Sequence, residues 1–440
     1  MAITSRPAPG ASGARAPVGG GTLERAAARP RPPAPVRLLN RVGRRLRGPT
    51  ASPLRAEAFV RDARRATGLS DFGEAGWEEP LDVLVDALER EADLSPLGRR
   101  VMARMLTRDL ALRLRIVEAL RHAPAAAAAA AAVQRPLFVV GLPRTGTTLL
   151  YALLAQTPGA RPLLGWEAHD PVGPPPGRPD RRITVYGAQV TAMNYVAPDL
   201  RKVHLVETRG LRECWPLLNR SMVSGGYLVL ANVPSYERWL WAAGRDVFEA
   251  SYRLHRDQLR LLQAQRPIAH PTAHWVLKSP AHLVSLEALL AVYPDARIIQ
   301  THRDLAKVLP SNCSLFTVSR GICSDAGDPL ETGYQVLERS RRTLERSMAT
   351  RARIGGGRFF DVRYADLTAD PVGTVRAALA HFGEDLPAVA EDRLTRHLAG
   401  NPQHKHGPHS YSLEQFGLHR AEVDGVARDY HERFAVPREA

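Results

Sequence analysis

A short loop rich in glycine and threonine carries the residues of this sequence best suited to hold a phosphate. Gly141 and Gly146 let the backbone approach an anion closely. Arg144 can add a charged fork, and Thr147 and Thr148 can add hydroxyl donors. These residue types at this spacing predict a loop that binds a phosphate or a related anion.

The flanking segments predict how the loop is held. Residues 137–140 read LFVV, which is typical of a strand buried on both faces of a parallel sheet. The apolar run 149–155 predicts a helix, which Thr-Pro-Gly at 157–159 closes. A strand, a glycine loop and a helix together aim backbone N–H groups and the positive helix end at an anion. The alternative is an ordinary turn whose glycines serve the turn alone.

The loop departs from the nucleoside-triphosphate pattern at one position. The pattern G-x-x-x-x-G-K-[ST] is matched except that Thr147 stands in place of the lysine. A basic residue is present earlier in the loop instead, at Arg144. An NTP-dependent kinase on the same core is the alternative function. The missing lysine argues against it, as does the lack of a clear strand-end aspartate for Mg²⁺.

The positive charge of the chain is concentrated near its N-terminus. The 440 residues carry a formal net charge of +15. Residues 1–66 hold 14 arginines and three acidic residues, which gives 14 − 3 = +11 and leaves +4 for the rest. Residues 1–50 are rich in Pro, Gly, Ala and Arg, so we expect a disordered arm. Such an arm could contact nucleic acid or anionic lipid, or could be a solvated tail. No specific nucleic-acid partner is expected.

Cysteine content and hydropathy indicate the cellular compartment in which the protein is expected. Cys214, Cys313 and Cys323 have no metal-like spacing, and their odd number does not indicate a disulfide framework. The sequence lacks an apolar run of eighteen residues and the apolar core of a secretory signal. We therefore expect a cytoplasmic protein without a transmembrane segment.

Three regions are expected along the chain. Residues 1–50 form the arm, 51–132 a helical extension with an alanine-rich spacer, and 133–440 the main domain. Alternating strands and helices in this domain predict an α/β fold with a doubly wound parallel sheet, whose functional groups gather at the carboxyl ends of the strands. Further strands are expected at 161–167, 274–278, 296–301 and 358–363. Helices are expected at 183–195, 212–220, 236–265, 281–292, 305–317 and 329–353.

Four ordered motifs carry a family resemblance. They are VVGLPRTGTTLL, GWEAHDP, WVLKSPAHL, and Thr301-His302-Arg303 with Ser311 eight residues later and VRYADL downstream. With them the sequence resembles the sulfotransferase superfamily that uses 3′-phosphoadenosine 5′-phosphosulfate (PAPS), in the bacterial branch related to tyrosylprotein sulfotransferases. The match runs from about residue 68 to residue 418. The resemblance implies a P-loop-like core that transfers a sulfuryl group from PAPS to an acceptor hydroxyl or amine.

The resemblance assigns the nucleotide contacts. The 5′-phosphosulfate is expected at Arg144, Thr145, Gly146, Thr147 and Thr148, and Tyr364 is expected near the nucleotide. Arg303 and Ser311 match the pair that holds the 3′-phosphate. Their spacing suits this role, because a strand-end guanidinium and a hydroxyl two turns along the next helix can converge on one phosphate.

The transfer step needs a base and a group that stabilises the leaving oxygen. Glu167 is the candidate base, expected at the end of the second strand, and His169 is its rival. Lys278 resembles the lysine that contacts the bridging oxygen, and Arg144 is expected to face the phosphosulfate. We therefore expect Glu167, Lys278 and Arg144 to be catalytic.

The C-terminal part departs from the family pattern. Cytosolic relatives close the 3′-phosphate with an R-K-G-x-x-G segment, whereas this chain has a histidine-rich stretch in which Lys405 is the candidate contact. No metal is expected, because no carboxylate or cysteine ligands accompany these histidines and the reaction needs none. The acceptor stays open among a small molecule, a lipid, a glycan and a peptide, and a homodimer is compatible with the sequence.

Overall fold

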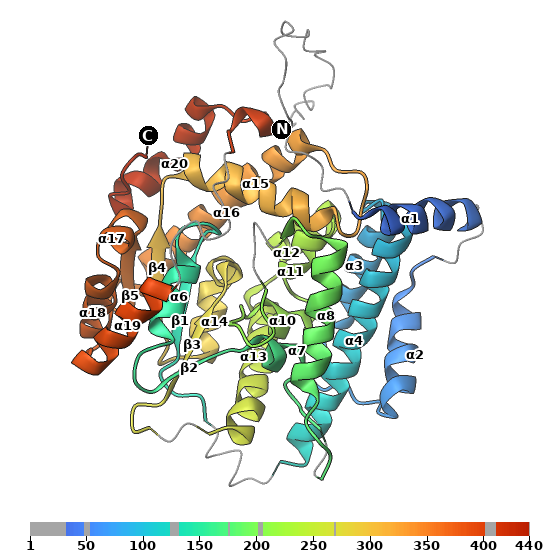
Figure 1. The fold of residues 1–440 in the computed structure, drawn as a ribbon, viewed down its shortest axis with the longest axis horizontal. Coiled ribbons are helices and arrows are strands. Elements are labelled where there is room, and N and C mark those ends of the chain that lie inside the picture. Colours follow the sequence, from blue (N-terminus) through green and yellow to red (C-terminus); the bar gives the residue numbers. More distant parts are fainter. Residues whose placement is uncertain are drawn as a thin grey trace, which may run out of the picture.

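The computed structural model describes residues 32–47, 53–123, 132–174, 177–200, 206–267, 270–400 and 411–439. A parallel sheet occupies one half of the molecule, and a group of helices from the N-terminal part fills the other half (Figure 1). The carboxyl ends of the strands point to the region where α15, α17 and the chain's C-terminal helix α20 gather. This edge of the sheet positions the candidate site.

The sheet has five strands in the order β2-β3-β1-β4-β5. All four neighbouring pairs are parallel. The strands are β1 (Leu137–Gly141), β2 (Ala160–Pro162), β3 (His274–Lys278), β4 (Arg297–His302) and β5 (Phe359–Arg363). The glycine loop follows β1 in the centre of the sheet, and α6 (Thr147–Leu154) follows the loop, as the sequence predicts. The expected α/β fold is confirmed.

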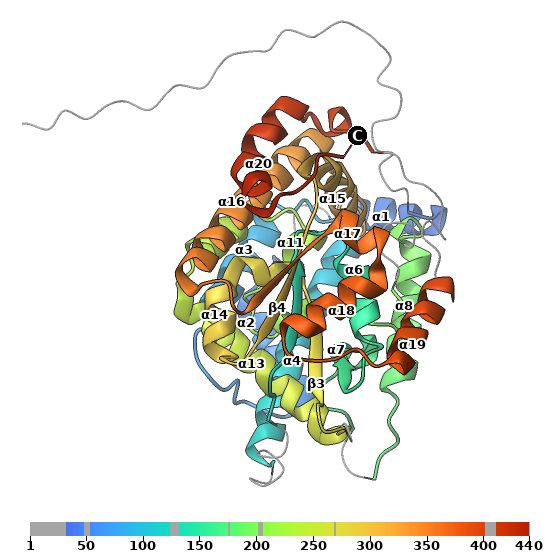
Figure 2. The same cartoon turned by 90° about the vertical axis from the view of Figure 1, so that its left-hand side faces the viewer.

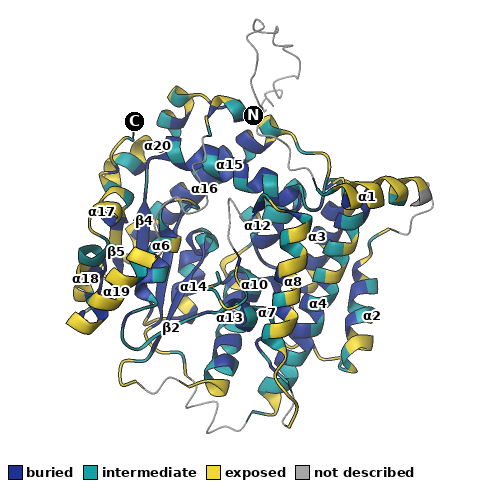
Figure 3. Cartoon of the chain, viewed as in Figure 1, coloured by how far each residue is buried: buried dark blue, intermediate teal, exposed yellow. Residues whose placement is uncertain are grey.

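Alternating side chains of β1 serve two hydrophobic cores. Leu137 and Val139 pack in one core with α6, α17 (Tyr364–Ala369), α18 (Pro371–His381) and α19 (Ala388–Gly400), which lie together in Figure 2. Phe138 and Val140 pack in the other core, which most of the remaining helices share. Every residue of β1, β3 and β4 is buried, which explains why β1 has no polar face, whereas the edge strands β2 and β5 are only partly buried (Figure 3).

The second core joins the sheet to the N-terminal helices. It contains residues of α2 (Ala56–Thr67), α3 (Glu78–Arg90) and α4 (Pro96–Arg121) together with strand residues. Helix α4 begins where the Ser95 hydroxyl accepts the N–H of Gly98 at 3.0 Å and Pro96 occupies the first turn. The helical extension therefore shares its hydrophobic core with the sheet.

The expectation of a disordered arm over 1–50 is wrong for α1 (Ala34–Arg47), which is helical and packs on the start of α4. Residues 1–31 lie outside the described residues. The expectation failed because the arginine-rich composition hides a helical spacing of apolar residues within this stretch.

Several expected elements are shorter or divided in the structure. The expected strand at 161–167 ends at Pro162, and Glu167 lies instead on the short helix α7 (Gly165–His169). The expected helix 236–265 is two helices, α12 (Pro234–Ala242) and α13 (Arg245–Gln265), which meet at Gly244. The remaining elements are α8 (Arg182–Val196), α10 (Trp215–Asn219), α11 (Gly226–Leu230), the 3₁₀ turn η2 (Pro280–Ser285), α14 (Leu286–Val292), α15 (Leu305–Arg320), α16 (Pro329–Ile354), η3 (Glu414–Phe416) and α20 (Arg420–Phe434).

No helix in the described part of the chain is long and apolar enough to cross a membrane. The three cysteines are buried and unpaired. Burial raises the pKa of the Cys323 thiol to about 12, so this thiol is protonated at neutral pH.

Candidate functional site

The loop after β1 is held in a conformation that its glycines make accessible. Gly146, at the start of α6, has φ +90°, and Gly141 has φ +152°. A Cβ atom on Gly141 would lie 2.3 Å from the Thr301 hydroxyl, so no side chain fits between β1 and β4 here. Arg144 also has a positive φ of 73°, which is strained for a residue with a Cβ atom and is typical of functional loops. The loop is thus folded tightly against the end of the sheet.

The threonines of the loop differ in what they can offer a ligand. The buried Thr145 hydroxyl donates to the carbonyl of Leu142 at 2.7 Å and lies 2.6 Å from the Thr301 hydroxyl. Its side chain therefore supports the loop and leaves the backbone to face a ligand. Thr147 is buried at the first turn of α6, whereas Thr148 is exposed.

The structure brings the predicted 3′-phosphate residues into one cluster with the loop. Nε of Arg144 donates to Oγ of Ser311 at 2.9 Å, and a guanidinium nitrogen of Arg303 donates to the backbone carbonyl of Arg144 at 3.2 Å. Ser311 lies on α15, two turns from the start of the helix. Desolvation and the neighbouring Arg303 cation both lower the pKa of Arg144. Two cations this close favour an anionic ligand between or beside them.

Two further side chains orient Arg303. The guanidinium lies over the ring of Tyr364 at 3.9 Å, so the tyrosine predicted near the nucleotide is in this cluster. Glu439, in the segment after α20, accepts from Nε and from a terminal nitrogen of Arg303 at 2.9 Å each. Sequence reasoning missed Glu439, because a glutamate 136 residues from its partner carries no local signal.

Lys278 ends β3 beside the loop. Its ammonium group forms an ion pair with Glu213 and donates to the Thr148 hydroxyl at 3.4 Å. The Lys278 side chain is 4 % exposed and that of Glu213 is 18 % exposed, so the carboxylate is the more open member of the pair. The backbone N–H of Cys214 donates to the Lys278 carbonyl at 2.9 Å and fixes this register. Sequence reasoning missed Glu213, because it stands in an irregular segment before α10 with no pattern around it.

Glu167 does not lie in this cluster. Its carboxylate is 1 % exposed and accepts from Arg161 at 3.1 Å, while Arg266 lies 3.3 Å away. Its second oxygen accepts the backbone N–H of Leu164 at 3.2 Å and caps α7. These contacts engage both oxygens of the Glu167 carboxylate, so we expect a structural role for it, and its role as base stays an untested prediction.

His169 lies at the end of α7 next to buried cations. Burial, with the nearby Arg108 and Arg220 guanidinium groups, lowers the pKa of His169 to about 3. The imidazole is therefore neutral at physiological pH and stays so over the range in which enzymes of this kind are assayed.

The remaining expectations concern ligands of the C-terminal part. Lys405 lies outside the described residues, as does the histidine-rich stretch around it. Within the described residues, no group of three or more His, Cys, Asp or Glu side chains is arranged to hold a metal ion.

Comparison with known proteins places this geometry in a family. The sequence model of the sulfotransferase family matches residues 136–388, which is more than half of the chain. The omega-hydroxy-beta-dihydromenaquinone-9 sulfotransferase Stf3 of Mycobacterium tuberculosis is 25 % identical over 323 residues, covering 69 % of this chain and 76 % of that protein. The Stf3 protein of Mycobacterium bovis matches equally.

Solved structures agree with the fold and with the class of enzyme. The sulfotransferase STF1 of M. tuberculosis is 35 % identical with a TM-score of 0.72, covering 86 % of this chain and 98 % of that one. The sulfotransferase STF9 of Mycobacterium avium is 28 % identical with a TM-score of 0.77, covering 88 % and 98 %. The chain therefore belongs to the sulfotransferase family, and it is a transferase that moves a sulfuryl group from PAPS, the donor that this family uses.

Proposed function

We propose that this chain transfers the sulfuryl group of PAPS to a hydroxyl group of a lipophilic small molecule, with no metal ion. The observation that carries the site assignment is the convergence of Arg144, Ser311 and Arg303 at the carboxyl end of the sheet. The loop at Arg144 and α6 would hold the 5′-phosphosulfate, and Arg303 with Ser311 would hold the 3′-phosphate. Tyr364, stacked on Arg303, would border the nucleotide.

The backbone of the loop supports this assignment independently of the side chains. Gly146 starts α6, so the first free N–H groups of the helix face the end of the sheet. Thr148 is exposed beside them and lies within reach of Lys278. We assign Gly146, Thr147 and Thr148 to the phosphosulfate through these donors, and Thr145 through its backbone because its hydroxyl is engaged inside the loop.

We assign the chemical step to Glu213 and Lys278. The acceptor hydroxyl gives its proton to the Glu213 carboxylate, and its oxygen forms a bond to sulfur. The bond between sulfur and the bridging phosphate oxygen breaks, and Lys278 stabilises the charge that develops on that oxygen. The existing ion pair supports this pairing, because both groups already meet at the edge of the loop. Arg144 adds a second cation toward the sulfuryl oxygens.

We propose a lipophilic acceptor because the relatives named Stf3 act on a hydroxylated menaquinone derivative. An amine, a glycan or a peptide acceptor would be detected by the same assay. The reaction balances without a metal ion, since Lys278 and Arg144 supply the positive charge. The buried free cysteines are compatible with a reducing cytoplasmic location, which we also propose.

Calorimetric titration tests the nucleotide assignment. Adenosine 3′,5′-bisphosphate should bind in the presence of EDTA, and ATP should bind poorly. The Arg303→Ala variant should lose ~1.5–3 kcal/mol of binding free energy, the scale of a hydrogen bond to a charged group. The loss should disappear with adenosine 5′-phosphosulfate, which lacks the 3′-phosphate.

The neighbouring strand offers a matched control. Arg363 ends β5, is exposed, and pairs with Asp366 at 2.7 Å. Arg363→Ala removes the same charge from the same edge of the sheet, so it should leave the affinity within about twofold. An equal loss for both nucleotides in Arg303→Ala would refute the 3′-phosphate role. A requirement for Mg²⁺ and a preference for ATP would refute the PAPS assignment.

A further inference from the structure

Helix α1 has a composition unlike the rest of the fold. Its 14 residues, APVRLLNRVGRRLR, contain five arginines and no acidic residue. The helix lies at one corner of the molecule, on the side away from the sheet (Figure 1). Its partners and its exposed side chains show which of its faces the fold uses.

One face of α1 packs against the protein. Val36 is buried there, and the side-chain oxygen of Asn40 accepts the backbone N–H of Leu97 at 3.1 Å. A Cβ atom on Gly43 would lie 2.8 Å from Pro96, so α1 approaches the first turn of α4 closely. Val36, Asn40 and Gly43 follow at intervals of four and three residues, which places them on one side of the helix. This side fixes how α1 is oriented.

The opposite face of α1 is apolar and exposed. Leu38 is 59 % exposed, Leu39 45 % and Val42 44 %. Leu38 and Val42 are one turn apart, so they form a continuous apolar strip with Leu39 beside it. Isolated exposed leucines are common, but three large apolar side chains within five residues on an otherwise basic helix are not explained by packing.

Arginines border this apolar strip. Among the described residues, no ion pair involves Arg41 or Arg45, which lie on the same side as Leu38 in the helical register. Arg44, in contrast, is paired with Asp325. The helix therefore presents an apolar strip and uncompensated positive charge to the same partner.

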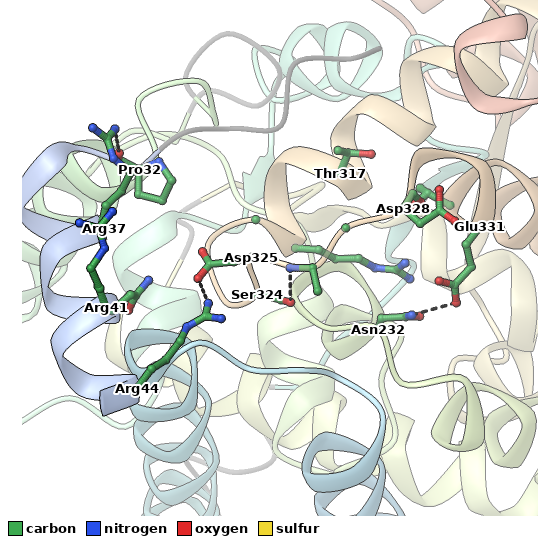
Figure 4. A pocket seen from close by; sticks show the side chains of 16 residues that line it. Pro32, Arg37, Arg41, Arg44, Asn232, Thr317, Ser324, Asp325, Asp328 and Glu331 are labelled. Atoms are coloured by element: carbon green, nitrogen blue, oxygen red, sulfur yellow. Dashed lines mark hydrogen bonds and ion pairs between the residues drawn. The ribbon is translucent and has the colours of Figure 1, made fainter. Parts of the chain in front are cut away.

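A pocket of about 480 Å³ lies behind α1, between it and the neighbouring ends of α15 and α16. Figure 4 shows Arg37, Arg41 and Arg44 on one wall, with Asp325 paired to Arg44 and Glu331 on the far side. Charges of both signs line this pocket, so it does not favour an anion as strongly as the outer face does. Arg41 lies at the border between this pocket and the apolar strip, and Arg45 lies on the outer face in the helical register.

We propose that α1 is an interfacial helix that docks this enzyme on the surface of an anionic lipid bilayer. Leu38, Leu39 and Val42 would enter the boundary between headgroups and acyl chains, and Arg41 and Arg45 would pair with lipid phosphates. An apolar strip with arginines beside it is the pattern that such helices share. Nucleic acid would use the arginines but would leave the apolar strip in water. The proposal does not depend on which residues carry out sulfuryl transfer.

Vesicle sedimentation with the full chain tests the proposal. The protein should bind vesicles of phosphatidylcholine that contain about a third or about half phosphatidylglycerol. It should bind vesicles of pure phosphatidylcholine far more weakly. Arg41→Gln with Arg45→Gln should weaken binding roughly 30-fold, at ~1 kcal/mol for each arginine near an anionic surface. Leu38→Ser with Val42→Ser should weaken it roughly tenfold or more, because two apolar side chains no longer enter the bilayer.

Helix α19, on the opposite side of Figure 1, offers matched controls. Arg393→Gln with Arg396→Gln removes the same charge, and Val389→Ser removes an apolar side chain that is 69 % exposed. Both controls should bind vesicles as the parent does. All variants should keep their affinity for adenosine 3′,5′-bisphosphate, which shows that they are folded.

Four results would overturn the proposal. The first is no binding of the parent to anionic vesicles at low salt. The second is equal loss in the α19 controls, which would mean that net charge alone governs binding. The third is a loss in the arginine variant with none in the Leu38/Val42 variant, which would indicate a purely electrostatic contact such as nucleic acid. The fourth is that the Leu38/Val42 variant loses self-association in sedimentation equilibrium while its vesicle binding is unchanged. That result would identify a second copy of the chain as the partner of α1.

Discussion

Substitution of two glutamates that differ in burial, Glu167 and Glu213, should have separate effects on stability and on catalysis. Glu167→Gln removes the charge that faces Arg161, whose side chain is 2 % exposed and lies 4.3 Å from the ring of Trp275. Two nitrogens of the Arg161 guanidinium already lack a hydrogen-bond partner in the structure. Removing one member of a buried ion pair costs about 3–5 kcal/mol. Glutamine keeps one oxygen acceptor, so we expect the lower end, about 3 kcal/mol of the free energy of unfolding.

Glu213→Gln should act on turnover instead. The carboxylate is partly open and already meets Lys278, so the loss of a proton acceptor should lower kcat by ~10²–10⁴. Affinity for adenosine 3′,5′-bisphosphate should stay within a few fold, because proton transfer contributes in the transition state and not in the bound ground state. In the folded Glu167→Gln protein, kcat should change by no more than a few fold.

Urea unfolding followed by tryptophan fluorescence measures the first effect, since Trp275 lies under the affected guanidinium. Single-turnover sulfuryl transfer from labelled PAPS measures the second, with nucleotide titration confirming that each variant is folded. His169→Ala serves as a further control and should be mild, because a pKa of about 3 makes its imidazole a weak proton acceptor. The reasoning is refuted if Glu167→Gln binds nucleotide normally but has lost turnover, while Glu213→Gln retains it.

Three other perturbations follow from the structure. Burial lowers the pKa of His255 to about 3 and that of His282 well below its usual value. As pH falls below about 6.5, the unfolded chain therefore binds protons at these histidines that the native state does not bind. Each histidine should lower the free energy of unfolding by ~1.4 kcal/mol per pH unit, down to its native pKa. Urea titrations at pH 7 and 5.5 would detect this loss. Deleting residues 1–50 should destabilise the protein by about 2–4 kcal/mol, because the packed face of α1 is lost, whereas a chain that starts at residue 32 should unfold at the parent's urea midpoint. Glu439→Gln should alter the affinity for adenosine 3′,5′-bisphosphate several-fold without changing that for adenosine 5′-phosphosulfate, since the carboxylate binds Arg303 alone among the nucleotide contacts; equal effects on both nucleotides would contradict this.

The centre of the fold was predictable because β1, β3 and β4 are short, fully buried strands with apolar residues in their middle. Strands β1 and β3 match the predicted segments closely, and Arg303 stands at the strand end where it was expected. The motifs are local in sequence, so their residues could be found by spacing alone. The convergence of Arg303, Ser311 and the loop follows from parallel strands, whose carboxyl ends share one edge.

The parts that escaped prediction depend on contacts between distant residues. The apolar residues before Glu167 predict a strand, but the chain turns after Pro162 and the Glu167 carboxylate caps a helix. Glu213 reaches Lys278 across 65 residues, and no local pattern marks it. Composition was also misleading for α1, since arginine-rich sequence is typical of disorder and of interfacial helices alike.

Helix α15 has consequences for how distant parts of this enzyme communicate. Its first turn is capped by Asp304 next to the nucleotide residues, and its 16 residues span roughly 24 Å at 1.5 Å per residue. Just beyond its far end, the carbonyl of Cys323 accepts the N–H of Ser95 at 2.9 Å, and a Cβ atom on Gly98 would lie 1.8 Å from that oxygen. The start of α4, on which α1 packs, is therefore in close contact with the segment that follows α15, the helix that carries Ser311. Binding of α1 to a bilayer that shifts this contact should change the affinity for the nucleotide. By linkage, the nucleotide should then change the affinity of α1 for the bilayer by the same factor.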